Sequence, residues 1–557
     1  MSTPHDLELE RILQARREVG TTTVHPPVAR CLVAVFLLTL VTVPLIDQLA
    51  GGVGSAAAER LAVALGRAAE TLGAGRPIAA NRELLGQIET VEDELEEDSA
   101  TAAALRPELQ GVLTGCLGSG NEKALVGRHG WLFYRPDVEY LTGPGFLEPR
   151  VLERRARGGK SWRHPPEPDP RPALVALARA FADRGVHFVL LPAPAKPMAA
   201  PEELSARFAG RTGAQASGRE LQNPSWERFR TDLAAAGVEV VDPPPASFLR
   251  TDSHWRPDAV DATAAALARR IEDQGLLTDI PEAAFSWHRE TRVVTGHGDL
   301  AGMLELPAGW RLIEPETVKV ERVEGPGGEP WRSDPGAAVL LLGDSFTNVY
   351  SRAELGWGDS AGLAEQLSFH LERPVDVLAI NDGTDLDVRR RIAGWPPERL
   401  APKRVVIYQV ALRELAFGDW QPVDPPLPPV AVGGAATEEP ATGASQRIRV
   451  RATIAAVAAV PDPSSTPYRD ALVALRLDSV RVQGDAERRG FPDEILTYTW
   501  GMRDRSLTDA ARWLPGRQVE LTLTPWAEVA PQLETFQRLE LDDERALFLD
   551  TYWFGPR

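Results

Sequence analysis

Short apolar runs alternate with amphipathic stretches through the middle of the chain. Nearly continuous apolar runs occur at 186–191, 339–342 and 404–410, as is typical of parallel strands that are covered on both faces. Apolar residues recur with a helical period at 171–184 and 258–272, which predicts helices between the strands. The same patterns predict further helices at 226–235, 362–371 and 387–392, and strands at 238–241 and 375–380. This alternation predicts an α/β fold with a parallel sheet flanked by helices.

One of these strands delivers a candidate nucleophile. The apolar run 339–342 ends at Gly343, and Ser345 follows where a helix is predicted to begin. Open α/β sheets bind their ligands at the carboxyl ends of the strands, so Ser345 is placed where a reactive serine would be useful. The alternative is a serine that only caps the helix. A catalytic reading requires a base, an orienting acid and an oxyanion hole.

The base is predicted among nine histidines. His254 has Asp252 two residues before it, and in an extended segment both side chains point to the same side. The carboxylate can then bond one ring nitrogen while the other faces the serine. An exposed turn that caps the following helix is the alternative. His297 and Asp299 have the same spacing in reverse order and form a rival pair.

Residues 381–383, Asn-Asp-Gly, follow the strand predicted at 375–380 and would lie along the same sheet edge as Ser345. They are a candidate second part of the oxyanion hole, beside the backbone N–H of Ser345. The aspartates at 382, 385 and 387 lack the spacing of a calcium loop. No Cys/His cluster has zinc spacing, so neither a metal nor a cofactor is predicted.

The two ends of the chain differ from its middle. Residues 421–446 are rich in Pro, Gly, Ala, Thr and Glu without periodicity and predict a linker. Beyond it, strands are predicted at 447–460, 471–482, 494–503, 518–524 and 546–554, with a short helix at 506–513. Five strands with this helix before the fourth predict a small β-barrel of the OB type at 447–557.

Near the N-terminus, residues 31–46 carry no charge and follow several arginines. The pattern predicts a transmembrane anchor at 31–50, with a cytoplasmic tail at 1–30 and the rest of the chain outside the cytoplasm. A buried core helix and a cleaved signal peptide are the alternatives. Residues 51–120 predict a helical stalk, and residues 121–420 the main domain.

The net charge bears on the partners of the protein, and the cysteine content bears on its disulfides. The net charge of −18 argues against nucleic acid as a partner, because binding phosphates requires a basic face. A polyanionic substrate would likewise need a local basic groove. Only Cys31 and Cys116 are present, and a disulfide between them is not expected because Cys31 borders the apolar run.

Several short motifs resemble those of one family. They are Gly-x-x-Gly-Trp-Leu-Phe-Tyr at 127–134, Pro-x-Pro-x-Lys at 192–196, Thr-Asp-x-His-Trp at 251–255, Gly-Asp-Leu at 298–300 and Gly-Asp-Ser-Phe at 343–346. In composition and order the set resembles the periplasmic alginate O-acetyltransferases, the AlgJ/AlgX-like group of SGNH-hydrolase-type proteins. The resemblance covers about residues 80–420. Asp382 and Gln409 depart from the usual pattern.

The resemblance implies an SGNH-hydrolase-like fold and a catalytic triad of Ser345, His254 and Asp252. Further oxyanion or substrate-binding positions are predicted at Asn381, Gly383, Arg413, Tyr408 and Lys196. The implied activity is transfer of an acetyl group, through a serine acyl-enzyme, to hydroxyls of an exported polysaccharide. The implied partner is a multipass membrane O-acyltransferase that supplies the acetyl group. A carbohydrate esterase or deacetylase and a noncatalytic polysaccharide-binding component remain alternatives.

Overall fold

The structure is a computed structural model with two compact units, Met1–Val112 and Leu113–Arg557. The residues it describes are 26–51, 65, 66, 69, 72, 73, 81, 85, 99–158, 165–208, 221–283, 286–307, 309–381, 385–395, 397–423, 448–460, 470–482, 491–533, 536–539, 541 and 549–555. Several predictions lie outside these residues: the tail before residue 26, most of the stalk, Gly383 and all but the first residues of the linker.

The apolar stretch near the N-terminus is helical. Helix α2 (Pro26–Gly51) includes the residues predicted as a membrane anchor, and helix α5 (Ala100–Leu117) lies in the predicted stalk. Within the described part of the chain, no helix is long and apolar enough to cross a membrane. The predicted single-pass anchor at 31–50 is therefore not supported.

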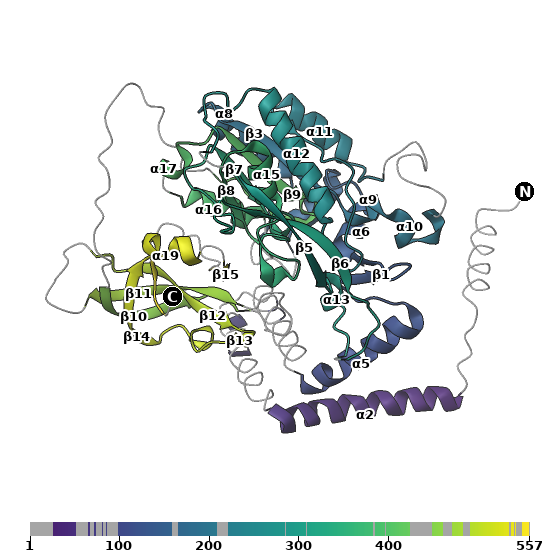
Figure 1. Ribbon diagram of the computed structural model, residues 1–557. Helices are drawn as coiled ribbons and strands as arrows, with labels where there is room; N and C mark the ends of the chain where they lie inside the picture. The colour runs from purple at the N-terminus through teal and green to yellow at the C-terminus, as the bar shows by residue number, and fades with distance from the viewer. Residues whose placement is uncertain are drawn as a thin grey trace, which may run out of the picture. The chain divides into compact units, whose positions relative to one another are not determined.

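A five-stranded parallel sheet forms the centre of the main domain (Figure 1). Its strand order is β4-β3-β9-β7-β8. The strands are β3 (His187–Ala193), β4 (Glu239–Val240), β7 (Val339–Gly343), β8 (Val375–Ala379) and β9 (Val405–Ala411). All five were predicted from the apolar runs, and the α/β architecture is confirmed.

Alternate residues of each central strand enter two different cores. Val339 and Leu341 of β7 pack with helices α12 (Pro257–Asp273) and α15 (Leu363–Leu371). Leu340 and Leu342 pack on the other face, with helices α8 (Pro170–Ala182), α11 (Trp226–Ala235) and α16 (Asp385–Ala393). Both faces of the strand are covered, and this explains why its sequence is continuously apolar rather than alternating.

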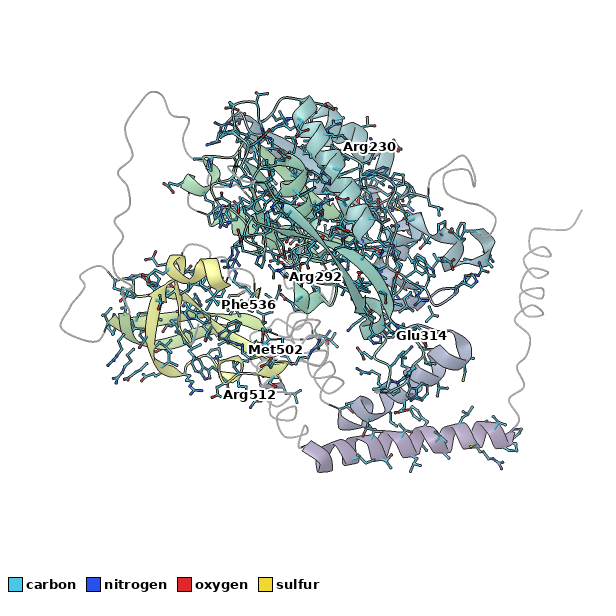
Figure 2. The ribbon with its side chains drawn as sticks, viewed as in Figure 1. Arg230, Arg292, Glu314, Met502, Arg512 and Phe536 are labelled. Atoms are coloured by element: carbon cyan, nitrogen blue, oxygen red, sulfur yellow. The ribbon has the colours of Figure 1, made fainter. Side chains whose placement is uncertain are left out.

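The remaining elements of this domain are short, except for one pair of strands. Strands β5 (His288–Gly296) and β6 (Glu316–Glu324) pair along nine antiparallel positions in a region where the sequence predicted no regular structure. Most of β5 is exposed, and Arg292, labelled in Figure 2, pairs with Glu290 on its surface. Charged residues on both faces of an exposed strand remove the alternation by which strands are recognised.

The short elements are the strands β1 (Ala124–Val126) and β2 (Leu132–Tyr134), the helices α6 (Arg135–Thr142), α7 (Pro149–Ala156), α9 (Lys196–Ala199), α10 (Pro201–Leu204), α13 (Asp299–Met303), α14 (Ser345–Asn348), α17 (Pro397–Leu400) and α18 (Leu412–Phe417), and the 3-10 turns η1 (Ala206–Phe208) and η3 (Ala353–Leu355). Strands β1 and β2 pair antiparallel. Strand β2 lies at the end of the motif at 127–134.

The C-terminal region is a five-stranded barrel. Its strands close in the order β12-β16-β14-β10-β11-β12, with a parallel pairing only between β12 and β16. They are β10 (Ile448–Val457), β11 (Ala471–Val482), β12 (Ile495–Arg503), β14 (Gln518–Pro525) and β16 (Thr551–Trp553). Strands β13 (Ser506–Leu507) and β15 (Gln537–Leu539), turn η4 (Ala510–Arg512) and helix α19 (Trp526–Leu533) complete it. The barrel predicted from the sequence is confirmed.

A buried ion pair joins two strands of the main sheet at the end away from Ser345. Lys403, just before β9, lies 2.8 Å from Asp376 of β8, and both side chains are fully buried. The Lys403 Nζ also donates to two backbone carbonyls, and Arg399 gives Asp376 a second cationic partner at 3.0 Å.

We expect Lys403→Met to lower the free energy of unfolding of the main domain by about 3 kcal/mol, because a buried carboxylate loses a partner. Urea denaturation measures this. Arg404→Met is the matched control: its ion pair with Asp279 is long, at 4.0 Å, and exposed, so the change should stay within about 0.5 kcal/mol. Equal effects of the two substitutions would contradict the prediction.

Candidate active site

Most of the predicted site residues that the structure describes lie at one edge of the parallel sheet. Ser345 follows β7, Asn381 follows β8, Arg413 follows β9 and Lys196 follows β3. Since all these strands are parallel, their carboxyl ends lie at the same edge, where α/β proteins place their ligands. The segment with Asp252 follows β4 and completes the set.

Close packing fixes the turn that carries Ser345. A Cβ on Gly343 would lie 2.2 Å from Thr347 Oγ1 and 2.7 Å from Gln409 Oε1, so a larger residue would displace these side chains. Gln409 accepts hydrogen bonds from the Asp344 amide at 3.1 Å and from the Thr347 hydroxyl at 2.9 Å. Asp344 in turn caps helix α14. Gln409, noted in the sequence only as a departure, fastens the nucleophile turn to β9.

Asp252 and His254 form the hydrogen-bonded pair that their spacing predicts. Asp252 Oδ1 accepts from His254 Nδ1 at 2.6 Å and from the His254 amide at 3.0 Å. Asp252 Oδ2 accepts from Trp357 Nε1 at 2.7 Å and from the Asp299 amide at 3.0 Å. The carboxylate is 2% exposed, and four donors satisfy it, so it holds the ring in one orientation.

The pair is fastened to the serine turn through aromatic residues. The His254 ring packs edge-on against Phe346, with 4.8 Å between the ring centroids. Trp255 Nε1 donates to the Phe346 carbonyl at 3.0 Å, and the Tyr350 hydroxyl donates to the Trp255 carbonyl at 2.8 Å. His254 therefore lies beside the residue that follows Ser345.

The second ring nitrogen of His254 is available for chemistry. His254 Nε2 is buried and has no hydrogen-bond partner in the described part of the chain. A hydrogen bond from the Ser345 hydroxyl, which the predicted triad requires, is thus not formed in this structure; such bonds often tighten only when substrate binds. A buried, unpaired imidazole nitrogen on a ring that packs against the residue after Ser345 suits a general base.

The electrostatics of the pair favour a charged carboxylate. Burial alone would raise the pKa of Asp252, but the His254 ring, the Trp357 indole and the Asp299 amide outweigh it and hold that pKa below its usual range. Burial alone would lower the pKa of His254, but the charge and hydrogen bond of Asp252 outweigh it and raise that pKa above its usual value. The imidazolium formed during proton transfer is therefore stabilised.

Lys196 supports the loop that carries Asp252. Its side chain is fully buried, so the expected contact with substrate has no support. Its Nζ donates to the carbonyls of Arg250 and Asp252, both at 2.9 Å, and lies over the rings of Trp131 and Phe133 at 5.1 and 5.3 Å. Burial lowers the pKa of Lys196 to about 7. The lysine holds the backbone of the loop that carries the acid.

Tyr408 is also fully buried, in the core beneath the sheet, where its ring packs against Phe188. Its predicted contact with substrate has no support either. Arg413 fits a site residue better, because its guanidinium lies over the rings of Tyr134 and Phe346 and 3.3 Å from Asp137. Arg413 thus packs against Phe346, the residue that follows Ser345.

Asn381 is arranged as a hydrogen-bond donor. Its Oδ1 accepts from Asn348 Nδ2 at 3.0 Å, which fixes the orientation of the amide. Its Nδ2 is buried and has no partner among the described residues. An oriented N–H at this edge of the sheet suits the predicted oxyanion role. Gly383 lies outside the described residues.

The contacts of His297 and Asp299 distinguish this rival pair from His254 and Asp252. The Asp299 carboxylate accepts from the amides of Ser253 and Leu300, both at 2.7 Å, and lies 3.7 Å from His254 Nδ1. His297 is exposed. The geometry therefore favours His254 as the base. Trp357, which bonds Asp252, was missed, because one tryptophan in a glycine-rich loop gives no sequence signal.

Asp252, His254 and Asp299 also place possible metal-ligand atoms within 4.8 Å of one another. A cation would compete with the N–H and O–H donors that already point at both carboxylates, and with the bond between Asp252 and His254 Nδ1. The donor set thus fits an oriented histidine better than a metal.

We expect Gly298→Ala to damage this site. Gly298 has φ +78°, and an added Cβ would lie 2.3 Å from the Thr251 carbonyl and 2.8 Å from the Asp252 amide. The strain should cost about 1–3 kcal/mol and displace Asp252. Urea denaturation and mass-spectrometric labelling of Ser345 by a sulfonyl fluoride measure both effects. Gly302→Ala, in open helical surroundings, should change neither, and equal effects of the two would refute the argument.

The raised pKa of His254 predicts the pH dependence of Ser345 acylation. Only the neutral imidazole can accept the serine proton, so the rate should fall as the pH drops through a value above about 6.5, the usual histidine pKa. Asp252→Asn removes the charge that raises the pKa of His254. The fall in rate at acid pH, the acid limb of the profile, should therefore move to lower pH, and the maximal rate should fall by about 10⁴-fold. Acylation by an acetyl ester from pH 4 to 9 measures this; a wild-type limb below pH 6 would contradict it.

Comparisons with known proteins identify the family of the chain. Residues 124–411 match the family described as "SGNH hydrolase-like domain, acetyltransferase AlgX". The "Probable alginate O-acetylase AlgJ" of Pseudomonas aeruginosa is 30% identical over 241 residues, which cover 41% of this chain and 53% of that protein. The protein of the same description from Azotobacter vinelandii is 25% identical over 271 residues, or 46% and 61% of the two chains.

The chain thus spans only about half to three fifths of the length of these relatives. Among solved structures, the "O-Acetyltransferase Domain of Pseudomonas putida AlgJ" aligns at 20% identity with a TM-score of 0.38, covering 53% of this chain and 94% of that one. The family match spans just over half of the 557 residues. The chain therefore belongs to the family of SGNH hydrolase-like domains of the acetyltransferase AlgX.

Proposed function

We propose that the protein is an O-acetyltransferase that moves an acetyl group, through an acetyl-enzyme on Ser345, to hydroxyls of an exported polysaccharide. The observation that carries the proposal is the Asp252–His254 pair, buried and oriented beside the serine turn with His254 Nε2 unpaired. The relatives named as alginate O-acetylases support an alginate-like acceptor.

In the first half-reaction, His254 Nε2 accepts the proton of the Ser345 hydroxyl, and the serine oxygen attacks the carbonyl carbon of the acetyl donor. The oxyanion that forms accepts hydrogen bonds from the Ser345 amide and from Asn381 Nδ2. The carbonyl re-forms, the donor's leaving group takes the proton from His254, and the acetyl group remains on Ser345. Asp252 stays charged and stabilises the imidazolium throughout.

In the second half-reaction, His254 takes the proton of a sugar hydroxyl, whose oxygen attacks the acetyl-enzyme. The serine oxygen leaves and recovers the proton from His254, which restores the enzyme. The same steps with water as the attacking group give hydrolysis. An acetyl esterase therefore differs only in the acceptor, and the acceptor must be tested directly.

The proposal includes a cellular location and a partner protein. Modification of an exported polymer puts the main domain outside the cytoplasm. Acetyl groups made in the cytoplasm must then cross the membrane, and a multipass membrane O-acyltransferase is the class of protein that supplies them to Ser345. Both statements rest on the family resemblance and on the chemistry of the acceptor.

We expect the full chain, incubated with an acetyl-ester donor and uronate oligosaccharides, to form acetylated sugar. Ser345→Ala should lower this rate about a thousandfold or more, whereas Ala at the exposed Ser286 should leave it unchanged. Mass spectrometry of the sugar and of the protein measures product and acetyl-enzyme. Free acetate without acetylated sugar would identify an esterase, and sugar binding without acetyl-enzyme would overturn the enzymatic proposal.

A further inference from the structure

A second carboxylate, Asp299, is built into the acid–base pair. Its Oδ1 accepts from the Ser253 amide at 2.7 Å, and its Oδ2 accepts from the Ser253 hydroxyl. Its own amide donates to Asp252 Oδ2 at 3.0 Å. Asp299 thus forms two hydrogen bonds with Ser253, the residue between Asp252 and His254, and a third with Asp252 itself.

Asp299 also faces the same ring nitrogen that Asp252 binds. Asp299 Oδ2 lies 3.7 Å from His254 Nδ1, compared with 2.6 Å for Asp252 Oδ1. The Ser253 hydroxyl lies 3.4 Å from this nitrogen and bonds Asp299, so it fills the space between them. Two carboxylates therefore act on one imidazole, one through a direct bond and one at slightly longer range.

The backbone is shaped for this approach. Gly298 adopts a positive φ, and its Cα lies so close to residues 251 and 252 that a Cβ could not be added. Helix α13 begins at Asp299 immediately afterwards. This close approach brings the Asp299 amide within hydrogen-bonding distance of the Asp252 carboxylate.

We propose that Asp299 is a positioning residue of the transfer site, which aligns the Asp252–His254 pair and sets the proton affinity of His254. The inference rests on the proposed function, in which His254 is the base. If Asp299 paired with His297, or only held Ser253 in place, it would not affect the proton affinity of His254.

The charges around the pair determine the sign of the effect. Burial, together with the charge of Asp252, raises the pKa of Asp299 to about 6. Above that pH the ionised Asp299 adds a second negative charge beside His254, which favours the imidazolium. Other charged and titratable groups that act on Asp299 or His254 come from neighbouring elements: Tyr134, Asp137, Lys196 and Arg413. None of them bonds His254, so Asp252 and Asp299 dominate.

The test is Asp299→Asn, which keeps the shape and the backbone N–H to Asp252 but removes the charge. We expect the acid limb of Ser345 acylation by an acetyl ester to move to lower pH by about one unit or more. NMR titration of labelled histidine should show the same shift for His254, identified by its loss in His254→Ala. Asp261→Asn is the control, because Asp261 bonds a different histidine, His370, outside the site, and should leave both readouts unchanged.

Ser253→Ala is the second variant. It removes the hydroxyl that holds Asp299 Oδ2 and should also move the limb, even if Asp299→Asn folds poorly. An unchanged limb and an unchanged His254 titration in both variants would overturn the inference. If wild type forms no acetyl-enzyme, the proposed function fails, whereas the NMR titration still decides the effect of Asp299 on His254.

Discussion

The site depends on the satisfaction of one buried charge, the carboxylate of Asp252. A charged carboxylate removed from water is costly unless donors replace its hydration. Here the four donors come from three parts of the chain: His254 close by, Trp357 more than a hundred residues later, and the Asp299 amide between them. All three must be in place at once. The Asp252 carboxylate thus joins, through hydrogen bonds, segments that lie far apart in the sequence.

The same requirement explains why so many motifs converge on one short loop. Lys196 binds the carbonyls of this loop from one side, and Trp255 binds the serine turn from the other. The aromatic residues Trp131 and Phe133 in turn face the ammonium group of Lys196. Residues of the motifs at 127–134 and 192–196 thus support the loop that carries the acid–base pair, directly or through Lys196.

Sequence predicts the parts of this design that depend on local pattern. The buried strands and the Asp-x-His spacing follow from periods of apolar and polar residues, and they lie where they were predicted. Lys196 and Tyr408 were predicted as oxyanion or substrate-binding positions, yet tertiary packing buries both. Trp357 and strand β5 could not be predicted, since a single donor and an exposed charged strand leave no periodic signal.

Burial of the pair bears on the choice between transfer and hydrolysis. Imidazole can accept a proton from water as well as from a sugar hydroxyl, so the base alone does not exclude either acceptor. The side chains of Asp252 and His254 are only 2% and 8% exposed, so little bulk water reaches the pair. If the protein transfers acetyl groups as proposed, selection for the sugar must come from how well it fills the site beside Ser345, since an acceptor that occupies the site excludes the competing water.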